Sequence, residues 1–283
     1  MVVATARDAD SEHPDALLRL DAALAGRGLA RSRTHAARLI ADGAVTVDGV
    51  VAGKPSLKVH ADQVIAIIAA DHYVSRAAHK LIAALDAFPV EVTGRLALDV
   101  GASTGGFTQV LLERGARAVI ALDVGHGQLS PHLADDPRVS VIEGFNAREL
   151  TAAGLAAAAG TAELPDLAVA DLSFISLRTV LPAVVATLGT GADYLVLIKP
   201  QFEVGRTGIR EGIVRDPALR EEAVNDVLWT AWDLGLPIGG LVPSPLVGTR
   251  GNHEYLVWLN ATHGSNPTQW RDRVHSCAGT DRA

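Results

Sequence analysis

Cysteine, whose disulfides stabilise many small secreted proteins, is almost absent from the sequence. Its 283 residues include one cysteine, Cys277, which can form neither an internal disulfide nor a cysteine-based zinc site. Residues 1–15 contain one arginine and several acidic residues but no long apolar segment, which is untypical of a secretory signal. We therefore expect a cytoplasmic protein, and we expect no bound metal.

Long apolar runs are absent as well. The longest uninterrupted ones, such as Val64–Ala70, fall far short of the roughly 20 residues that a membrane-spanning helix needs, so no membrane association is expected. Aromatic residues make up only 4% of the chain, yet 48% of its residues are hydrophobic. This composition, with many glycines between apolar runs, is typical of an α/β enzyme and untypical of a coiled coil or a disordered chain.

The charges are unevenly distributed along the chain. The formal net charge is −7, which taken as a whole speaks against nucleic acid binding. Residues 17–80, however, contain nine basic and five acidic residues, whereas residues 81–283 contain fifteen and twenty-three. A basic segment before a larger acidic one resembles an RNA-binding module attached to a catalytic domain, although chance could produce the same imbalance.

The basic segment has the pattern of a small α+β domain. Leucines from Leu17 to Leu29 at helical spacing predict one helix, and a second helical pattern begins at Arg31-Ser32-Arg33. The pair Asp48-Gly49 between valine-rich runs predicts a hairpin, and Val64–Ile68 predicts a further strand. We expect a compact domain that precedes the larger one.

From Arg95 onward, strand patterns alternate with helical patterns, which is the signature of a parallel sheet with helices on both faces. Seven strands predict an α/β fold with a Rossmann-like sheet of the methyltransferase type. The expected strands are Leu96–Val100, Ala118–Asp123, Val139–Ile142, Leu167–Asp171, Tyr194–Ile198, Ile238–Val242 and Glu254–Leu259. The expected parts of the chain are an N-terminal extension (1–16), the basic α+β domain (17–68), a linker (69–74), the α/β domain (75–262) and a polar C-terminal tail (263–283).

The run D-V-G-A-S-T-G-G-F, from Asp99 to Phe107, places an acidic residue at a strand end and a glycine-rich turn before a helix. Glycines let backbone N–H groups approach a ligand closely, and in open α/β sheets this turn binds nucleotide-like ligands. The spacing G-x-x-x-G-G differs from the G-x-G-x-x-G of dinucleotide sites, and no Gly-Lys-Ser/Thr follows, which excludes a P-loop. Asp123 ends the next strand, where a carboxylate can accept hydrogen bonds from both hydroxyls of a ribose.

Together these features favour S-adenosylmethionine as the cofactor, with a tight turn that binds no ligand as the alternative. The candidate cofactor-binding residues are Asp99, Gly101, Ala102, Ser103, Thr104, Gly105, Gly106, Phe107, Asp123 and Val124.

Four polar residues stand at the ends of expected elements. Lys80 leads into an apolar helix, and Asp171 and Lys199 end the fourth and fifth strands. Glu254 begins the last strand, which is usually antiparallel in such sheets, so that its start lies at the same edge as the other strand ends. We expect all four side chains to converge beside the glycine turn, with two unrelated ion pairs as the alternative.

Such a set of side chains fits methyl transfer to an oxygen. The acceptor alcohol must be aligned and must lose its proton near the transition state. A lysine takes that proton only if its pKa is lowered, and a second cation together with partial burial has that effect. Our hypothesis is that Lys199 accepts the proton, that Lys80 positions and tunes it, and that Asp171 and Glu254 orient both lysines.

The chain resembles the TlyA family of ribose 2′-O-methyltransferases, which join a module like that of small-subunit ribosomal protein S-four to an FtsJ-like catalytic domain. The resemblance extends from Leu17 to Asn260 and departs from the family pattern at Ala77, at His126 and in the glycine-poor loop 206–212. The matching motifs are Val74-Ser-Arg, Gly101-Ala-Ser-Thr-Gly-Gly-Phe-Thr, Asp123-Val-Gly-His-Gly-Gln-Leu, Asn146-Ala-Arg, Asp171-Leu-Ser-Phe-Ile-Ser-Leu, Lys199-Pro-Gln-Phe-Glu and Gly251-Asn-His-Glu.

This resemblance implies a tetrad of Lys80, Asp171, Lys199 and Glu254, and it adds Asn146 to the cofactor site. It implies a cytidine ribose in large-subunit ribosomal RNA as the substrate, in longer members also one in small-subunit RNA, and an effect on sensitivity to capreomycin-type antibiotics. Ribosomal RNA or ribosomal subunits would be the partners. The candidate RNA-binding residues are Arg19, Arg31, Ser32, Arg33, Arg38, Arg76, Phe174 and Arg206.

Three other functions compete with this interpretation. An RNA base methyltransferase usually has a cysteine nucleophile or an Asn/Asp-Pro-Pro-aromatic motif, whereas Cys277 lies in a polar segment and the chain has Asp171-Leu-Ser-Phe. A hemolysin-like membrane activity is disfavoured because neither a spanning segment nor a basic amphipathic helix is evident. An RNA-binding scaffold without catalysis is disfavoured by the intact set of lysines and acidic residues.

Overall fold

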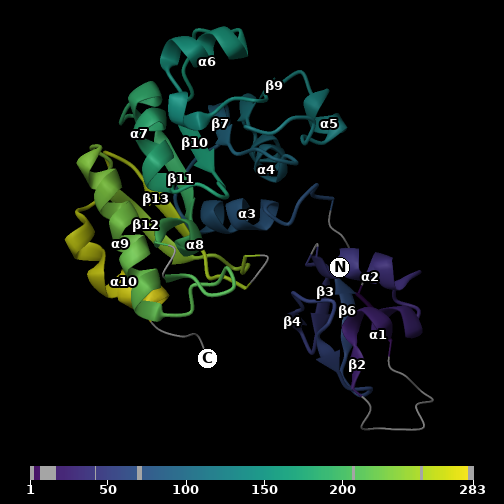
Figure 1. Cartoon of the computed structure of the whole chain (residues 1–283). Coiled ribbons are helices and arrows are strands. Elements are labelled where there is room, and N and C mark those ends of the chain that lie inside the picture. Colours follow the sequence, from purple (N-terminus) through teal and green to yellow (C-terminus); the bar gives the residue numbers. More distant parts are fainter. Residues whose placement is uncertain are drawn as a thin grey trace. The chain divides into compact units, whose positions relative to one another are not determined.

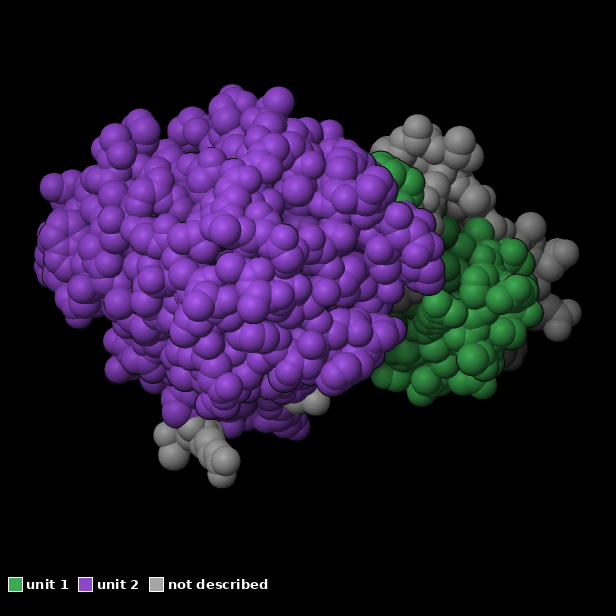
Figure 2. Space-filling view, turned by 90° about the horizontal axis from the view of Figure 1, so that it is seen from above, with its two compact units in different colours: residues 1–76 green, residues 77–283 purple. Residues whose placement is uncertain are grey.

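The computed structural model describes residues 3–6, 17–41, 43–68, 72–205, 208–248 and 251–279 (Figure 1). The chain divides into two compact units, Met1–Arg76 and Ala77–Ala283 (Figure 2). We refer to them as unit 1 and unit 2.

Unit 1 is an α+β domain whose two helices pack on a sheet. Its antiparallel sheet has the order β1-β6-β3-β4, and β2 pairs separately with β5. Asp48 and Gly49 join β3 to β4 with φ angles of 51° and 82°, which confirms the predicted hairpin turn. The elements are β1 (Val3–Ala6), β2 (Leu18–Arg19), α1 (Leu20–Gly26), α2 (Arg33–Ala41), β3 (Val45–Val47), β4 (Val50–Val51), β5 (Lys58–Val59) and β6 (Ile65–Ile68).

Unit 2 is built on a seven-stranded sheet with the order β12-β13-β11-β10-β7-β8-β9. The five strands from β11 to β9 are parallel to one another, and β13 runs antiparallel to both of its neighbours, β11 and β12. This sheet confirms the predicted α/β fold, and all seven expected strands are present. Within the described part of the chain, no helix is long and apolar enough to cross a membrane.

The elements of unit 2 are α3 (Ala78–Ala87), β7 (Leu96–Val100), α4 (Gly106–Glu113), β8 (Ala118–Leu122), α5 (Pro131–Ala134), β9 (Val139–Ile142), η1 (Ala147–Glu149), α6 (Ala152–Ala159), β10 (Leu167–Ala170), α7 (Leu177–Leu188), β11 (Asp193–Ile198), α8 (Pro200–Glu203), α9 (Pro217–Asp233), β12 (Ile238–Pro243), β13 (Tyr255–Leu259), η3 (Pro267–Trp270) and α10 (Arg271–Ala278).

Helices cover both faces of this sheet. Side chains alternate along a strand, so Leu96, Leu98 and Val100 of β7 join a core with residues of α7, α9 and α10. Helices α3 and α4 pack against each other, and they contact β13 and β7 respectively. Because the parallel strands point the same way, the carboxyl ends of β7, β8, β10 and β11 meet at one edge of the sheet, together with the start of β13.

The C-terminal segment differs from our expectation of a polar tail. It forms η3 and α10, and Val274, Cys277 and Ala278 are buried in the same core as α9. Their spacing puts the three residues on one face of a helix, which a largely polar sequence conceals. The tail prediction was therefore wrong, because three apolar residues on one face suffice to pack a short helix.

A buried carboxylate joins the two helices of unit 1. Asp21, in the first turn of α1, accepts hydrogen bonds from Nε and Nη2 of Arg19 at 3.1 and 3.0 Å and from Nη2 of Arg33 on α2 at 3.2 Å. The hydrogen bonds from Arg19 are the main reason why the pKa of Asp21 is lowered from 3.8 to about 2. The carboxylate thus fixes both arginine side chains relative to the helices.

We predict that Asp21→Asn loosens unit 1 at neutral pH but not in acid. A carboxyl group whose folded-state pKa is depressed stabilises the fold above its unfolded pKa of about 4, and this stabilisation is lost as the pH falls toward 2. Hydrogen exchange of peptides from α1 and α2 should be roughly 10-fold faster in the variant than in wild type at pH 6, and the difference should shrink to about 2-fold or less at pH 2. The exposed Asp62→Asn is the control, and equal exchange of wild type and Asp21→Asn at pH 6 would contradict the prediction.

Candidate active site

The four residues of the predicted tetrad converge at the carboxyl edge of the unit 2 sheet. Asp171 directly follows β10 and Lys199 directly follows β11, while Glu254 directly precedes β13 and Lys80 lies in the first turn of α3. Lys80 Nζ donates to Glu254 Oε2 at 2.7 Å and to Asp171 Oδ2 at 3.4 Å. Lys199 Nζ lies 2.6 Å from Asp171 Oδ1. Asp171 therefore bridges the two lysines, one through each oxygen.

The cluster is almost withdrawn from solvent. The exposed side-chain fractions are 7% for Lys80, 13% for Asp171, 8% for Lys199 and 3% for Glu254. Burial by itself would raise the pKa of Asp171, but the attraction of Lys80 and Lys199 outweighs it and holds that pKa below its ordinary value. The positive charges of two lysines are neutralised by the negative charges of two carboxylates, which offsets the cost of removing all four groups from water.

Lys199 has one further partner, which was not among the predicted site residues. Its Nζ donates to the Ser173 hydroxyl at 2.8 Å. Ser173 lies between Asp171 and Phe174 in a motif that the sequence analysis quoted, so its position in that motif was the available signal.

The glycine turn lies against the segment that carries Asp171. Gly101 and Gly105 have φ angles of 84° and 98°, and Ser103 in the same turn has a φ of 47°. A Cβ atom on Gly101 would stand 3.1 Å from Leu172 Cδ2 and 3.4 Å from the Asp171 carbonyl oxygen. The positive φ of Gly101 favours glycine at this position, and the turn lies directly against the backbone of Asp171. The turn and the tetrad are therefore neighbours at the same edge of the sheet.

Asp99 stands behind this turn. It is fully buried, and it accepts a hydrogen bond from Thr108 Oγ1 of α4 at 2.7 Å. Burial raises the pKa of Asp99 to about 7. The structure thus places Asp99 where it ties α4 to β7, and Thr108 is a partner that the sequence analysis missed.

Asp123 is held beside the glycine turn by two backbone N–H groups. Ser103 N donates to Asp123 Oδ2 at 2.8 Å and Gly125 N donates to Oδ1 at 2.7 Å. The next residue, Val124, is 70% exposed. Each carboxylate oxygen retains a lone pair for a further donor, so this pair of acceptors fits the two hydroxyls of a ribose.

Asn146 lies in the segment that follows β9. Its Oδ1 accepts from the backbone N–H of Arg148 and so caps η1. The preceding residue, Phe145, donates its N–H to the Asp123 carbonyl oxygen at 3.1 Å. Asn146 and Asp123 therefore come from neighbouring loops at the same edge of the sheet.

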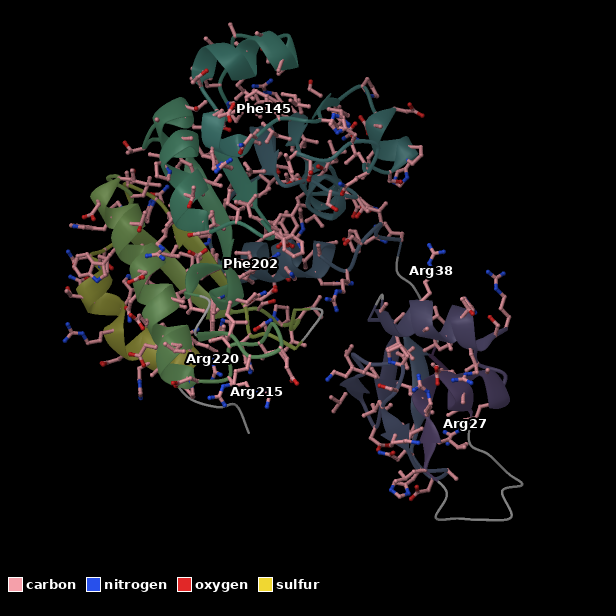
Figure 3. The ribbon with its side chains drawn as sticks, viewed as in Figure 1. Arg27, Arg38, Phe145, Phe202, Arg215 and Arg220 are labelled. Atoms are coloured by element: carbon pink, nitrogen blue, oxygen red, sulfur yellow. The ribbon has the colours of Figure 1, made fainter. Side chains whose placement is uncertain are left out.

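Phe174 projects from the site into solvent. Its side chain is 90% exposed, and its φ of 65° is rare for a bulky residue. The ring centroid lies 5.4 Å from that of Phe202 on α8, which Figure 3 labels. An exposed aromatic ring beside the tetrad is suited to stacking on a base.

The remaining RNA-binding candidates belong to unit 1, apart from Arg206, which lies outside the described residues. Arg19 and Arg33 are anchored by Asp21 yet are 44% and 60% exposed. The Ser32 hydroxyl accepts from the His35 N–H at the start of α2. Arg31, Arg38 on α2 and Arg76 complete the set (Figure 3 labels Arg38).

Comparisons with known proteins agree with this geometry. Residues 73–261 match the FtsJ-like methyltransferase family, and residues 18–65 match the S4 domain. The 16S/23S rRNA (cytidine-2′-O)-methyltransferase TlyA of Mycobacterium tuberculosis is 50% identical over 244 residues, which cover 85% of this chain and 89% of the relative. Hemolysin A of Brachyspira hyodysenteriae is 39% identical over 241 residues, which cover 85% of this chain and 98% of the relative.

A solved structure is similar along nearly the whole chain. The structure of a protein from Streptococcus thermophilus, described as a hemolysin, has a TM-score of 0.70 and 36% sequence identity. The match covers 92% of this chain and 95% of that chain. The sequence matches and this structure agree with the two-unit architecture, and the chain therefore belongs to the TlyA family of FtsJ-like methyltransferases that carry an S4 domain.

Proposed function

We propose that the chain transfers a methyl group from S-adenosylmethionine to the ribose 2′-hydroxyl of a cytidine in ribosomal RNA. The observation that carries this proposal is the buried set of two lysines and two carboxylates directly beside the glycine turn. Half of the aligned residues are identical to a relative whose name states this activity for 16S and 23S rRNA. The proposal extends that activity to this chain.

The cofactor would be held by the glycine turn and by the loops after β8 and β9. Asp123 would accept the ribose hydroxyls, Val124 would cover the adenine, and Asn146 would face it from the neighbouring loop. The backbone from Gly101 to Gly106 would line the amino-acid end, while Asp99 would shape the turn through Thr108. When bound, S-adenosylmethionine supplies an electrophilic methyl group on a sulfonium sulfur.

Lys199 would accept the proton of the acceptor hydroxyl. For this step the nitrogen is the neutral amine, which has two N–H groups and one lone pair. One N–H group donates to Ser173, and the lone pair takes the proton from the 2′-hydroxyl. The ammonium group that results pairs with Asp171 Oδ1, which lies 2.6 Å from the nitrogen. Lys80, in contrast, lies between two carboxylates. Lys80 would keep Asp171 in place, and Asp171 would in turn orient the Lys199 nitrogen.

The RNA would be bound by unit 1 and by the exposed ring beside the tetrad. We assign residues 17–68 as the RNA-binding domain, in which Arg19, Arg31, Ser32, Arg33 and Arg38 contact phosphates, with Arg76 at its end. Asp21 supports this role because it presents two arginine side chains in a fixed arrangement. Phe174 would stack on a base that is turned out of the RNA, and Arg206 is proposed as a further RNA contact on the family resemblance alone.

The proposed reaction leaves a chemical signature in the RNA. Each ribosomal subunit is incubated with the chain and labelled S-adenosylmethionine, and the RNA is then hydrolysed in alkali. A 2′-O-methyl group removes the nucleophile that alkaline cleavage needs, so we expect the label in alkali-resistant dinucleotides that begin with cytidine. Label found only in mononucleotides would indicate base methylation instead.

Substitutions at Lys199 test the assignment of the proton acceptor. We expect Lys199→Ala to lower the rate of transfer by at least about 100-fold, because general-base assistance is lost. Lys199→Arg keeps a cation beside Asp171 but cannot accept a proton, so it should be as slow. Binding of S-adenosylmethionine, measured by calorimetry, should remain close to wild type in both variants. A Lys199→Arg variant with wild-type activity would remove Lys199 from this role.

A further inference from the structure

The two lysines of the tetrad differ in the partners that fix them. Lys80 is held by carboxylate oxygens of both Glu254 and Asp171. Lys199 Nζ lies 2.6 Å from one carboxylate oxygen of Asp171 and donates to the neutral hydroxyl of Ser173 at 2.8 Å. With a single partner, the lysine nitrogen can still rotate about that contact. With two partners, the direction of its lone pair is fixed. Ser173 is the second partner of Lys199.

The segment that carries Ser173 is a strained turn. Phe174, the next residue, has a φ of 65°, a conformation that costs free energy for a bulky side chain and persists only where the surroundings enforce it. The turn begins at Asp171, which is fixed by both lysines, so its start is anchored in the tetrad itself.

The other end of the turn is fastened by Glu203. This buried carboxylate accepts from the Ser176 hydroxyl at 2.5 Å and from the Leu177 N–H at 2.7 Å, at the beginning of α7. Glu203 ends α8, the short helix that starts directly after Lys199. The Ser173 turn and Lys199 are therefore tied together at two points, by Glu203 to Ser176 and by Lys199 to Ser173.

We propose that Ser173 is a positioning residue for the methyl transfer, which directs the lone pair of the neutral Lys199 amine toward the acceptor hydroxyl. This inference rests on the proposed function, in which Lys199 receives the proton. Ser173 itself exchanges no proton with the RNA. The contacts of Asp171 at the start of the turn and of Glu203 at its end hold the Ser173 hydroxyl in place before the RNA binds.

The separate effects of a Ser173 substitution on kcat and on KM distinguish a positioning role from a direct contact with the RNA. Ser173→Ala should lower kcat by about 10- to 100-fold, the loss of a hydrogen bond to a charged group, while KM for the ribosomal subunit stays near wild type. Ser173→Thr restores a hydroxyl and should recover most of the lost kcat. Ser276→Ala, an exposed serine of α10, is the control and should behave as wild type. An unchanged kcat, or a loss confined to KM, would overturn the proposal.

A second measurement does not depend on methyl transfer. Limiting acetic anhydride is reacted with the full chain, and the acetylation of Lys199 is compared with that of Lys80 by peptide mass spectrometry. The Ser173→Ala change should raise the ratio of Lys199 to Lys80 labelling by roughly 10-fold, because only Lys199 loses a partner. An unchanged ratio would overturn the positioning role even if the enzyme is active. If the wild-type chain yields no 2′-O-methyl group, the proposed function fails, and this ratio still decides whether Ser173 fixes Lys199.

Discussion

The carboxylate of Asp171 is the interaction on which the rest of the site depends. One of its oxygens pairs with Lys80 and the other with Lys199, so this side chain is the direct link between the two lysine nitrogens. An unpaired charge at this depth would be strongly destabilising, whereas the balanced group of two cations and two anions can be buried. Burial in turn strengthens every interaction inside the cluster, because water no longer screens it. The site can therefore hold a lysine nitrogen at a defined position beside the cofactor turn.

The sheet is what makes this arrangement possible. Asp171 and Lys199 follow the neighbouring parallel strands β10 and β11. Glu254 lies much later in the sequence, and it reaches the same edge because β13 is antiparallel to β11. Lys80 is added by α3, which packs on α4 and contacts β13. Gly101 completes the site, since its positive φ favours a residue without a Cβ where the glycine turn lies against the Asp171 backbone. Strand direction thus brings Asp171, Lys199 and Glu254 to one edge, and the packing of α3 adds Lys80.

Strand ends were the most informative signal in the sequence. Polar residues that close apolar strands predicted the tetrad, and the structure brings Lys80, Asp171 and Lys199 together as expected. Contacts that depend on a local turn could not be predicted in the same way, because the pattern of apolar residues does not contain them. The Ser173 hydroxyl accepts from Lys199 directly before Phe174, whose positive φ marks an irregular backbone. The C-terminal helix was missed for a related reason, since the few apolar residues on its buried face are outnumbered by polar ones.

The most direct test of this account is a structure of the chain bound to a ribosomal subunit and S-adenosylhomocysteine. The quantity to measure is the distance from Lys199 Nζ to the nearest atom of the nucleotide in the site. If Lys199 accepts the proton, this atom is a ribose 2′-oxygen at hydrogen-bond distance, about 3 Å away. A base atom in that position, or a 2′-oxygen that faces Lys80 instead of Lys199, would contradict it.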